Sequence, residues 1–213
     1  MQTKQKPKLR DAEATRARIL AAAKKVFSKS GLGGARVDDI AERANANKRM
    51  IYHYFGSKED LFQAVLEEAY TDIRNAEQNL DLDHIPPREA LEKLVRFTWD
   101  YYLKNPEFLT LVNSENLHRA KHLKKSEVIP VVSRRFVMMV KSLLDRGVAD
   151  GTFRSGIDPT QLNITIAAIG YYYLTNRYTG AIVFERDLMT KEALDQRVTF
   201  NIETIMRLVC VTP

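Results

Sequence analysis

Polar side chains suited to nucleic-acid recognition cluster between residues 48 and 53. A helix over this stretch leaves four of them on its outer face: Lys48, Arg49, Tyr52 and His53. An arginine can donate two hydrogen bonds to O6 and N7 of guanine, and a methionine such as Met50 can contact the thymine methyl group. A tyrosine hydroxyl, or a lysine at a helix N-terminus such as Lys58, can donate to a phosphate. The stretch predicts a helix that contacts DNA; the alternative is a solvated helix face without a partner.

Apolar residues around this stretch predict two short helices joined by a tight turn. Four of them follow the spacing i, i+3, i+4 and i+7 before the turn, and two more follow it: Val37, Ile40, Ala41, Ala44, then Ile51 and Phe55. The turn contains Asn45 and Asn47, and asparagine tolerates the left-handed backbone of such a corner better than other non-glycine residues. The pattern is that of a helix-turn-helix.

The helix-turn-helix and the segments around it resemble the TetR family of bacterial transcriptional regulators. The family's motifs stand here as TRARILAAA at residues 15–23 with Phe27, a loop with Gly31, IA at 40–41 with Ala44, Tyr52 with Phe55, and SKEDL at 57–61. The resemblance implies contacts to base edges from four side chains: Lys48, Arg49, Met50 and His53. It implies phosphate contacts from Tyr52 and Lys58.

Two positions depart from the family pattern. Asn45 stands where glycine is usual, which the backbone tolerates. Arg36 stands where the family has serine or threonine, so the usual hydroxyl N-cap of the second helix is missing. We expect Arg36 to contact a phosphate instead.

The chain is predicted to be all-α, and the resemblance implies nine helices, with an N-terminal three-helix head and a helical ligand-binding and dimerisation body. We expect a flexible basic arm at residues 1–12, the DNA-binding head at 13–58 and the body at 59–213. The first helix is predicted over residues 15–29. Start signals, including Ser57, Asp158 and Thr190, predict the helices after the head over residues 57–78, 86–104, 106–122, 126–150, 158–178 and 190–210.

The body combines aromatic side chains with amides, and small-molecule pockets are mostly apolar with a few placed polar groups. With the ligand cavity that the resemblance implies, this leads us to expect a small organic effector bound by five residues: Trp99, Phe108, Asn116, Tyr172 and Asn176. The alternative for each is a place in the core or in a dimer interface. The resemblance also implies a homodimer through the last two helices, which carry two apolar sets: Ile164, Ala167, Ala168, Tyr171 and Leu174, then Val198, Ile202, Ile205, Met206 and Val209.

Glu115, His118 and His122 follow the spacing i, i+3 and i+7, which places a carboxylate and two imidazoles on one helix face. Such groups can bind a metal ion. Arg119 and the lysines nearby would repel a cation, so we expect no metal site, although the spacing leaves the question open.

Charge is distributed unevenly along the 213 residues. Residues 1–58 hold 14 Lys and Arg against 5 Asp and Glu, whereas residues 59–213 hold 19 against 22. A basic end that carries a helix-turn-helix is suited to the phosphate backbone of DNA. The sequence contains neither an apolar run long enough to span a membrane nor a signal-peptide pattern at its start, so we expect a cytoplasmic protein.

These features predict a ligand-responsive transcriptional regulator that binds a palindromic DNA operator as a homodimer and, as is most common in the family, represses. No GxSxG, P-loop, GxGxxG or HExxH motif occurs, so we expect neither an enzyme nor a cofactor. The main alternative is a constitutive architectural DNA-binding protein without an effector.

Overall fold

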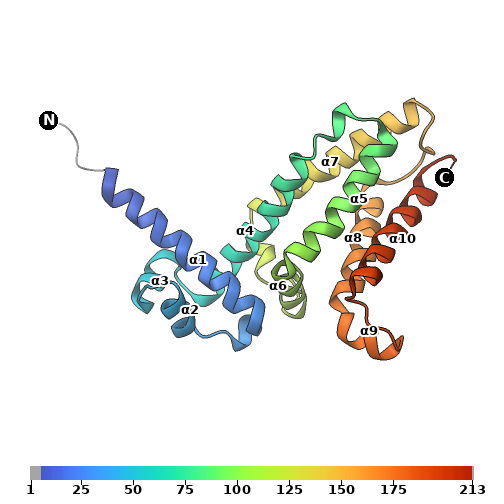
Figure 1. The fold of residues 1–213 in the computed structure, drawn as a ribbon. Helices are drawn as coiled ribbons and strands as arrows, with labels where there is room; N and C mark the ends of the chain where they lie inside the picture. The colour runs from blue at the N-terminus through green and yellow to red at the C-terminus, as the bar shows by residue number, and fades with distance from the viewer. Residues whose placement is uncertain (1–5, 213) are drawn as a thin grey trace. The chain divides into compact units, whose positions relative to one another are not determined.

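The computed structural model describes residues 6–212, which fold into helices with short connections (Figure 1). This part contains ten α-helices and two short 3-10 helices. Their bounds are α1 (Lys6–Gly34), α2 (Val37–Arg43), α3 (Lys48–Phe55), α4 (Lys58–Gln78), η1 (Leu82–His84), α5 (Pro87–Lys104), α6 (Pro106–Leu117), η2 (Leu123–Lys125), α7 (Val128–Ala149), α8 (Pro159–Thr175), α9 (Arg177–Val183) and α10 (Lys191–Val209). The predicted all-α fold is confirmed.

Several helix boundaries differ from the prediction: the helix predicted over residues 106–122 ends at Leu117, and the first helix ends at Gly34 rather than at residue 29. The helix predicted over residues 158–178 ends at Thr175, because Asn176 leaves the helical region (φ −100°, ψ 14°), and α9 follows as a separate helix. The described part therefore has ten helices rather than nine. Helix α1 begins at Lys6 rather than at residue 15, so residues 6–12 of the predicted arm are helical, while residues 1–5 lie outside the described residues.

Three predicted helix starts are confirmed by side-chain hydrogen bonds. The Ser57 hydroxyl accepts from the N–H of Asp60 at 3.0 Å, which forms the predicted cap of α4. Asp158 accepts from the N–H of Gln161 at 2.7 Å, and Thr190 accepts from the N–H of Ala193 at 3.2 Å. These local patterns predict helix starts well because both partners lie within one turn.

The chain divides into two compact units. Unit 1 holds Met1–Tyr70 and Glu107–Ile129, and unit 2 holds Thr71–Pro106 and Pro130–Pro213. Unit 1 therefore combines α1 to α3 and most of α4 with α6, which the sequence analysis had assigned to the body.

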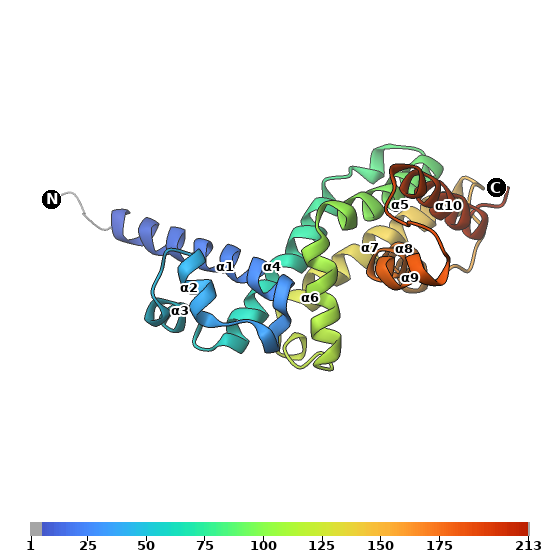
Figure 2. The same cartoon turned by 60° about the horizontal axis from the view of Figure 1, so that its bottom comes forward.

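Unit 1 is built around aromatic contacts between α1, α4 and the segment after α6. The rings of Phe27 and Phe62 meet edge to face with centroids 5.1 Å apart, and Phe62 contacts His122 in the same way at 5.2 Å. The N–H of Leu32 donates to the hydroxyl of Ser114 on α6 at 3.4 Å. Figure 2 shows α6 beside the C-terminal end of α1, in agreement with this bond.

Unit 2 has its own apolar core, in which α5 packs against α8 and α10. Ile205, Met206 and Val209 of α10 are buried in this core. We had predicted that these three residues form a dimer surface, and this is wrong, because they pack inside their own unit. Leu174 is buried too, whereas Ile164 on α8 is 53% exposed.

No helix among the described residues is long and apolar enough to cross a membrane.

Candidate nucleic-acid interface

The corner between α2 and α3 has the geometry that the sequence predicted. Asn45 adopts a positive φ of 47°, the left-handed conformation that asparagine tolerates. Asn47 has a different role, since its side chain accepts from the N–H of Met50 at 2.9 Å and caps α3. Ile51 and Phe55 are buried and fix the inner face of α3. The confirmed helix-turn-helix leaves the opposite face of α3 open to solvent.

The predicted base-contacting side chains and Tyr52, the predicted phosphate contact, lie together on α3. Arg49, Tyr52 and His53 are exposed, and Met50 is half-buried beside them. Lys48, at the first position of the helix, forms an ion pair of 3.0 Å with Asp38 of α2, and both side chains are about half exposed. An exposed pair of this kind contributes little stability, about 0 to 1 kcal/mol, so a phosphate or base can replace Asp38 at low cost.

The two predicted phosphate contacts outside α3 differ in their surroundings. Arg36 is exposed and makes no capping hydrogen bond at the start of α2, as predicted from its lack of a serine or threonine hydroxyl. Lys58 is half-buried, and its ammonium donates to the carbonyl of Ala35 at 3.1 Å. This bond ties the start of α4 to the connection before α2, a positioning role that the sequence analysis missed.

Two arginines of α1, which the sequence analysis did not single out, contact the helix-turn-helix. The guanidinium of Arg16 lies 4.9 Å from the centre of the Phe55 ring, a cation–π contact. Arg18 donates to the carbonyl of Ala44 at 3.4 Å, directly before the corner. Both arginines belong to the TRARILAAA motif, but the motif alone does not indicate the contacts that they make.

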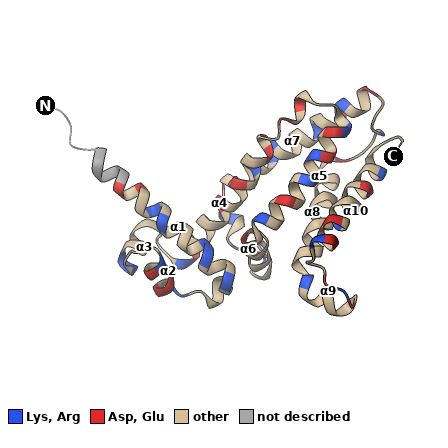
Figure 3. Cartoon of the chain, in the orientation of Figure 1, with Lys and Arg blue, Asp and Glu red and all other residues tan. Residues whose placement is uncertain are grey.

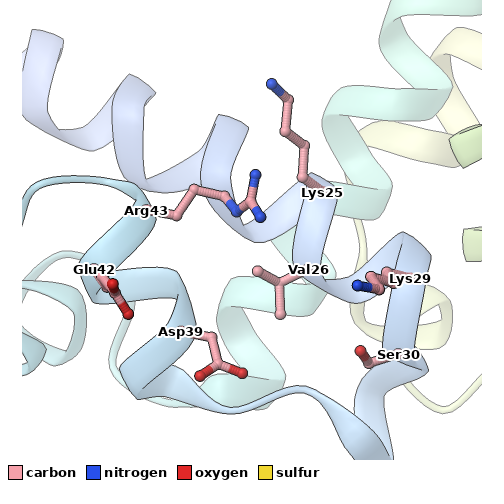
Figure 4. Close-up of a pocket in the computed structure, with 7 residues that line it drawn as sticks. All are labelled: Lys25, Val26, Lys29, Ser30, Asp39, Glu42 and Arg43. Atoms are coloured by element: carbon pink, nitrogen blue, oxygen red, sulfur yellow. The ribbon is translucent and has the colours of Figure 1, made fainter.

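The charged surface of unit 1 has two different parts. Figure 3 shows Lys and Arg on α1 and α3, and acidic residues on α2. Between α1 and α2 lies a hollow of about 500 Å³ (Figure 4). It is lined by Lys25, Val26, Lys29, Ser30, Asp39, Glu42 and Arg43. Because no residue of α3 lines it, this hollow is not the predicted base-reading surface.

The five predicted ligand residues fall in different units. Phe108 and Asn116 belong to unit 1, and Trp99, Tyr172 and Asn176 belong to unit 2. Trp99 is buried with its ring 5.7 Å from that of Tyr173, while Tyr172 is 62% exposed. The side-chain amides of Asn116 and Asn176 donate to carbonyls of their own helices, Val112 and Tyr172. Five surface hollows of the described residues are lined by other side chains.

A buried arginine–glutamate contact on α4 is a polar feature of unit 2 that the sequence analysis missed. Arg74 and Glu77 are joined at 3.0 Å, with their side chains 13% and 2% exposed. The guanidinium lies 4.1 Å from the centre of the Phe136 ring, and within the described residues its Nε has no hydrogen-bond partner. Burial raises the pKa of Glu77 to about 8, because its effect is larger than the opposing effect of the Arg74 charge.

Glu115 and His122 form a second buried pair, in unit 1. One oxygen of Glu115 accepts from the N–H groups of His122 and Leu123, at 2.7 and 3.0 Å, and the other lies 2.7 Å from His122 Nδ1. Burial alone would raise the pKa of Glu115, but these hydrogen bonds hold it below its usual value. His118 is engaged separately, with Nδ1 2.7 Å from the carbonyl of Ser114. The described residues contain no group of three side chains arranged to hold a metal ion.

The exposed, polar face of α3 on a helix-turn-helix defines a DNA-binding protein, here with a second all-helical unit. A family model described as bacterial regulatory proteins, tetR family, matches residues 19–65, and one described as tetracyclin repressor-like, C-terminal domain, matches residues 87–205. The chain belongs to the TetR family and is a DNA-binding transcriptional regulator rather than an enzyme.

Relatives and solved structures agree with this assignment. The chain is 42% identical over 196 residues to the HTH-type transcriptional repressor NicS of Pseudomonas putida, covering 92% of each chain. It is 29% identical over 199 residues to the HTH-type transcriptional regulator RutR of Escherichia coli, covering 90% of this chain and 86% of that protein. The crystal structure of a TetR transcriptional regulator from Chloroflexus aurantiacus has the same fold, with a TM-score of 0.72, 20% identity and coverage of 94% and 98%.

The buried Glu77 makes stability depend on pH in a defined direction. Its pKa rises from an ordinary 4.5 to about 8 on folding, so the folded chain holds a proton that the unfolded chain releases between these values. Stability therefore falls as pH rises through this window, by up to about 1.4 kcal/mol per pH unit. In Glu77→Gln the dependence is absent, so the stability of the variant relative to wild type should increase with pH.

Urea unfolding of both proteins across this pH window measures the difference. Glu92→Gln, which removes a carboxylate that is 47% exposed on α5, is the matched control for the loss of charge. A difference between Glu77→Gln and wild type that stays constant with pH would mean that Glu77 is ionised in the folded protein.

Proposed function

We propose that the protein is a repressor that binds a near-palindromic operator as a homodimer, with one α3 helix in the major groove of each half-site, and that a small organic ligand releases it. The observation that carries the proposal is the exposed cluster of Arg49, Tyr52 and His53 on a helix whose other face is buried. The name of the relative NicS, a transcriptional repressor, supports the direction of regulation.

An exposed apolar stripe on α8 supports the homodimer. Ile164, Ala168 and Tyr172 repeat at intervals of four residues and are all exposed, and Phe200 on α10 is exposed as well. Large apolar side chains in one stripe favour burial against another surface. A second copy of the same stripe would bury it under twofold symmetry, and a twofold dimer fits a palindromic operator.

Two features of unit 2 support a ligand that acts there. The Arg74–Glu77 pair keeps a guanidinium N–H buried without a partner, a state that a ligand acceptor would relieve. Helix α4 contributes to both units, since Tyr70 belongs to unit 1 and Thr71 to unit 2. A ligand bound near Arg74 would therefore act on the helix that begins directly after the helix-turn-helix.

Arg49→Ala should reduce discrimination at one base step by about 1 to 3 kcal/mol, because the variant cannot make a bidentate contact to guanine. Binding of single-base operator variants by fluorescence anisotropy measures this. Arg43→Ala is the matched control, because it removes the same charge from the exposed side of α2 and should alter affinity alike for all sequences. An Arg49→Ala protein that keeps the wild-type operator preference would contradict a base contact from Arg49.

Ile164→Asp should convert the dimer to monomers, with a dissociation constant raised roughly 10- to 100-fold, because two charges would be buried where the stripes meet. Sedimentation equilibrium measures the change. Met138→Asp, at an exposed apolar position on α7, is the control and should leave the assembly unchanged. A wild-type monomer at micromolar concentration, or a dimer that tolerates Ile164→Asp, would count against this interface.

An effector should weaken operator binding roughly 5- to 150-fold, which corresponds to a coupling of about 1 to 3 kcal/mol. Trp99 is the only tryptophan and is buried in unit 2, so a change in its emission reports binding there. Compounds that change this emission are then tested for their effect on operator affinity, with Trp99→Phe as the optical control. If no such compound shifts operator affinity, the constitutive DNA-binding alternative is favoured.

A further inference from the structure

A basic loop follows α6 in unit 1. Residues 118–125, with the sequence HRAKHLKK, contain four Lys and Arg and no Asp or Glu. All four cationic side chains are exposed: Arg119, Lys121, Lys124 and Lys125. Within the part of the chain that the structure describes, no acidic side chain is paired with any of them. We call residues 118–125 the basic loop.

The basic loop contrasts in charge with the chain around it. Residues 59–213 hold 19 Lys and Arg against 22 Asp and Glu. Without the four cations of the loop, 15 remain against the same 22. The loop is thus a concentrated positive region in an otherwise acidic part of the sequence, and it belongs to the same compact unit as α3.

The backbone of the loop has a costly and well-defined shape. Arg119 and Ala120 have positive φ angles of 57° and 58°, which cost about 1 to 2 kcal/mol per residue for non-glycine residues. The carboxylate of Glu115 offsets this cost, because it accepts from the N–H groups of His122 and Leu123 and contacts His122 Nδ1. Glu115 and His122 are 2% and 1% exposed, so this brace is shielded from water.

The brace formed by Glu115 and His122 contacts α4 and α1, the two helices that flank the helix-turn-helix in sequence. The ring of His122 meets Phe62 of α4, and the hydroxyl of Ser114, one residue before Glu115, accepts from Leu32 at the end of α1. The lysines of the loop are therefore presented from a surface that is fixed to the DNA-binding helices of the same unit.

We infer that the basic loop is a second DNA contact, which binds backbone phosphates of the duplex whose bases α3 reads. This inference rests on the proposed function. Phosphate is favoured over an acidic protein partner, because lysine is depleted in protein–protein interfaces and is a principal phosphate contact in protein–DNA complexes. Glu115 is a positioning residue for this contact: it holds the loop and does not touch DNA.

The test is the salt dependence of operator binding. Lys121→Gln with Lys124→Gln should lower the slope of log affinity against log salt by about 0.9 for each phosphate that the loop no longer neutralises. Preference for the matched over a mismatched operator should stay unchanged, because phosphate contacts carry no sequence information. Arg134→Gln with Arg135→Gln, two exposed arginines of α7 in unit 2, is the matched control and should keep the wild-type slope. Lys124→Gln with Lys125→Gln gives a second result on the same loop.

Glu115→Gln separates positioning from general electrostatics. The substitution makes the chain more positive, so long-range attraction alone would steepen the slope, whereas a loosened loop should make it shallower. An unchanged or steeper slope in Glu115→Gln would overturn the positioning role. If wild type shows no salt-dependent DNA binding, the proposed function itself fails. If wild type binds and both lysine pairs keep its slope, or match the α7 control, the loop contact alone is overturned.

Discussion

Helix α3 has only eight residues, and a helix of that length does not persist alone in water, because its few hydrogen bonds do not offset the cost of nucleation. Its conformation depends on burying Ile51 and Phe55 against the rest of unit 1. Each other local feature supports that burial: Asn47 caps the first turn, and Arg16 covers the ring of Phe55. The position of the outer face, including Arg49, thus depends on an apolar contact on the inner face, where Ile51 and Phe55 are buried.

The two units each bury a carboxylate, and the surroundings decide what that burial does. Glu115 receives two backbone N–H groups and contacts a ring nitrogen, so its pKa stays low and the carboxylate stabilises an unusual loop. Glu77 has one charged neighbour, and desolvation dominates, so its pKa rises. A buried pair is weak evidence for stability unless its remaining hydrogen-bonding groups are satisfied. The carboxylate of Glu115 is fully engaged and stabilises the loop, although Nε2 of His122 has no hydrogen-bond partner among the described residues. In the Arg74–Glu77 pair, Nε of Arg74 and one carboxylate oxygen of Glu77 lack such a partner.

The head was predictable from the sequence because its signals are local. Asn45, Ser57 and the apolar spacing around Ile40 act within one or two helical turns, and each led to the observed structure. Unit 2 was less predictable, because an apolar residue on a helix faces either its own core or a partner, and periodicity does not distinguish the two. Ile205 and Ile164 look equivalent in sequence, yet one is buried and the other is exposed.

The buried pairs were missed for a related reason. Glu115 and His122 were recognised by spacing as a possible metal site, but the carboxylate bonds the backbone of a turn that the sequence does not reveal. The loop after α6 begins where a helix was predicted to continue to residue 122, and Arg119 and Ala120 leave the helical region without any glycine to mark the change. Backbone hydrogen bonds from the N–H groups of Arg119 and Ala120 to the carbonyls of Asn116 and Glu115 close the end of α6, as in a Schellman motif. The Glu115 carboxylate then holds the next residues through the N–H groups of His122 and Leu123.

Helix α4 sets the physical condition for any control of DNA binding by unit 2. A ligand changes operator affinity only if it binds the DNA-competent and incompetent states unequally, so some element must differ between the states at both sites. Leu61 and Phe62 of α4 are buried in unit 1, and in unit 2 Glu77 of the same helix is buried and Arg74 is partly buried. The helix contains neither glycine nor proline from Lys58 to Gln78, so its hydrogen bonds are continuous between these two groups. In the proposed function, a ligand that pairs with Arg74 acts on α4 and needs no contact with α3, since the packing of Phe62 against Phe27 joins α4 to α1 within unit 1.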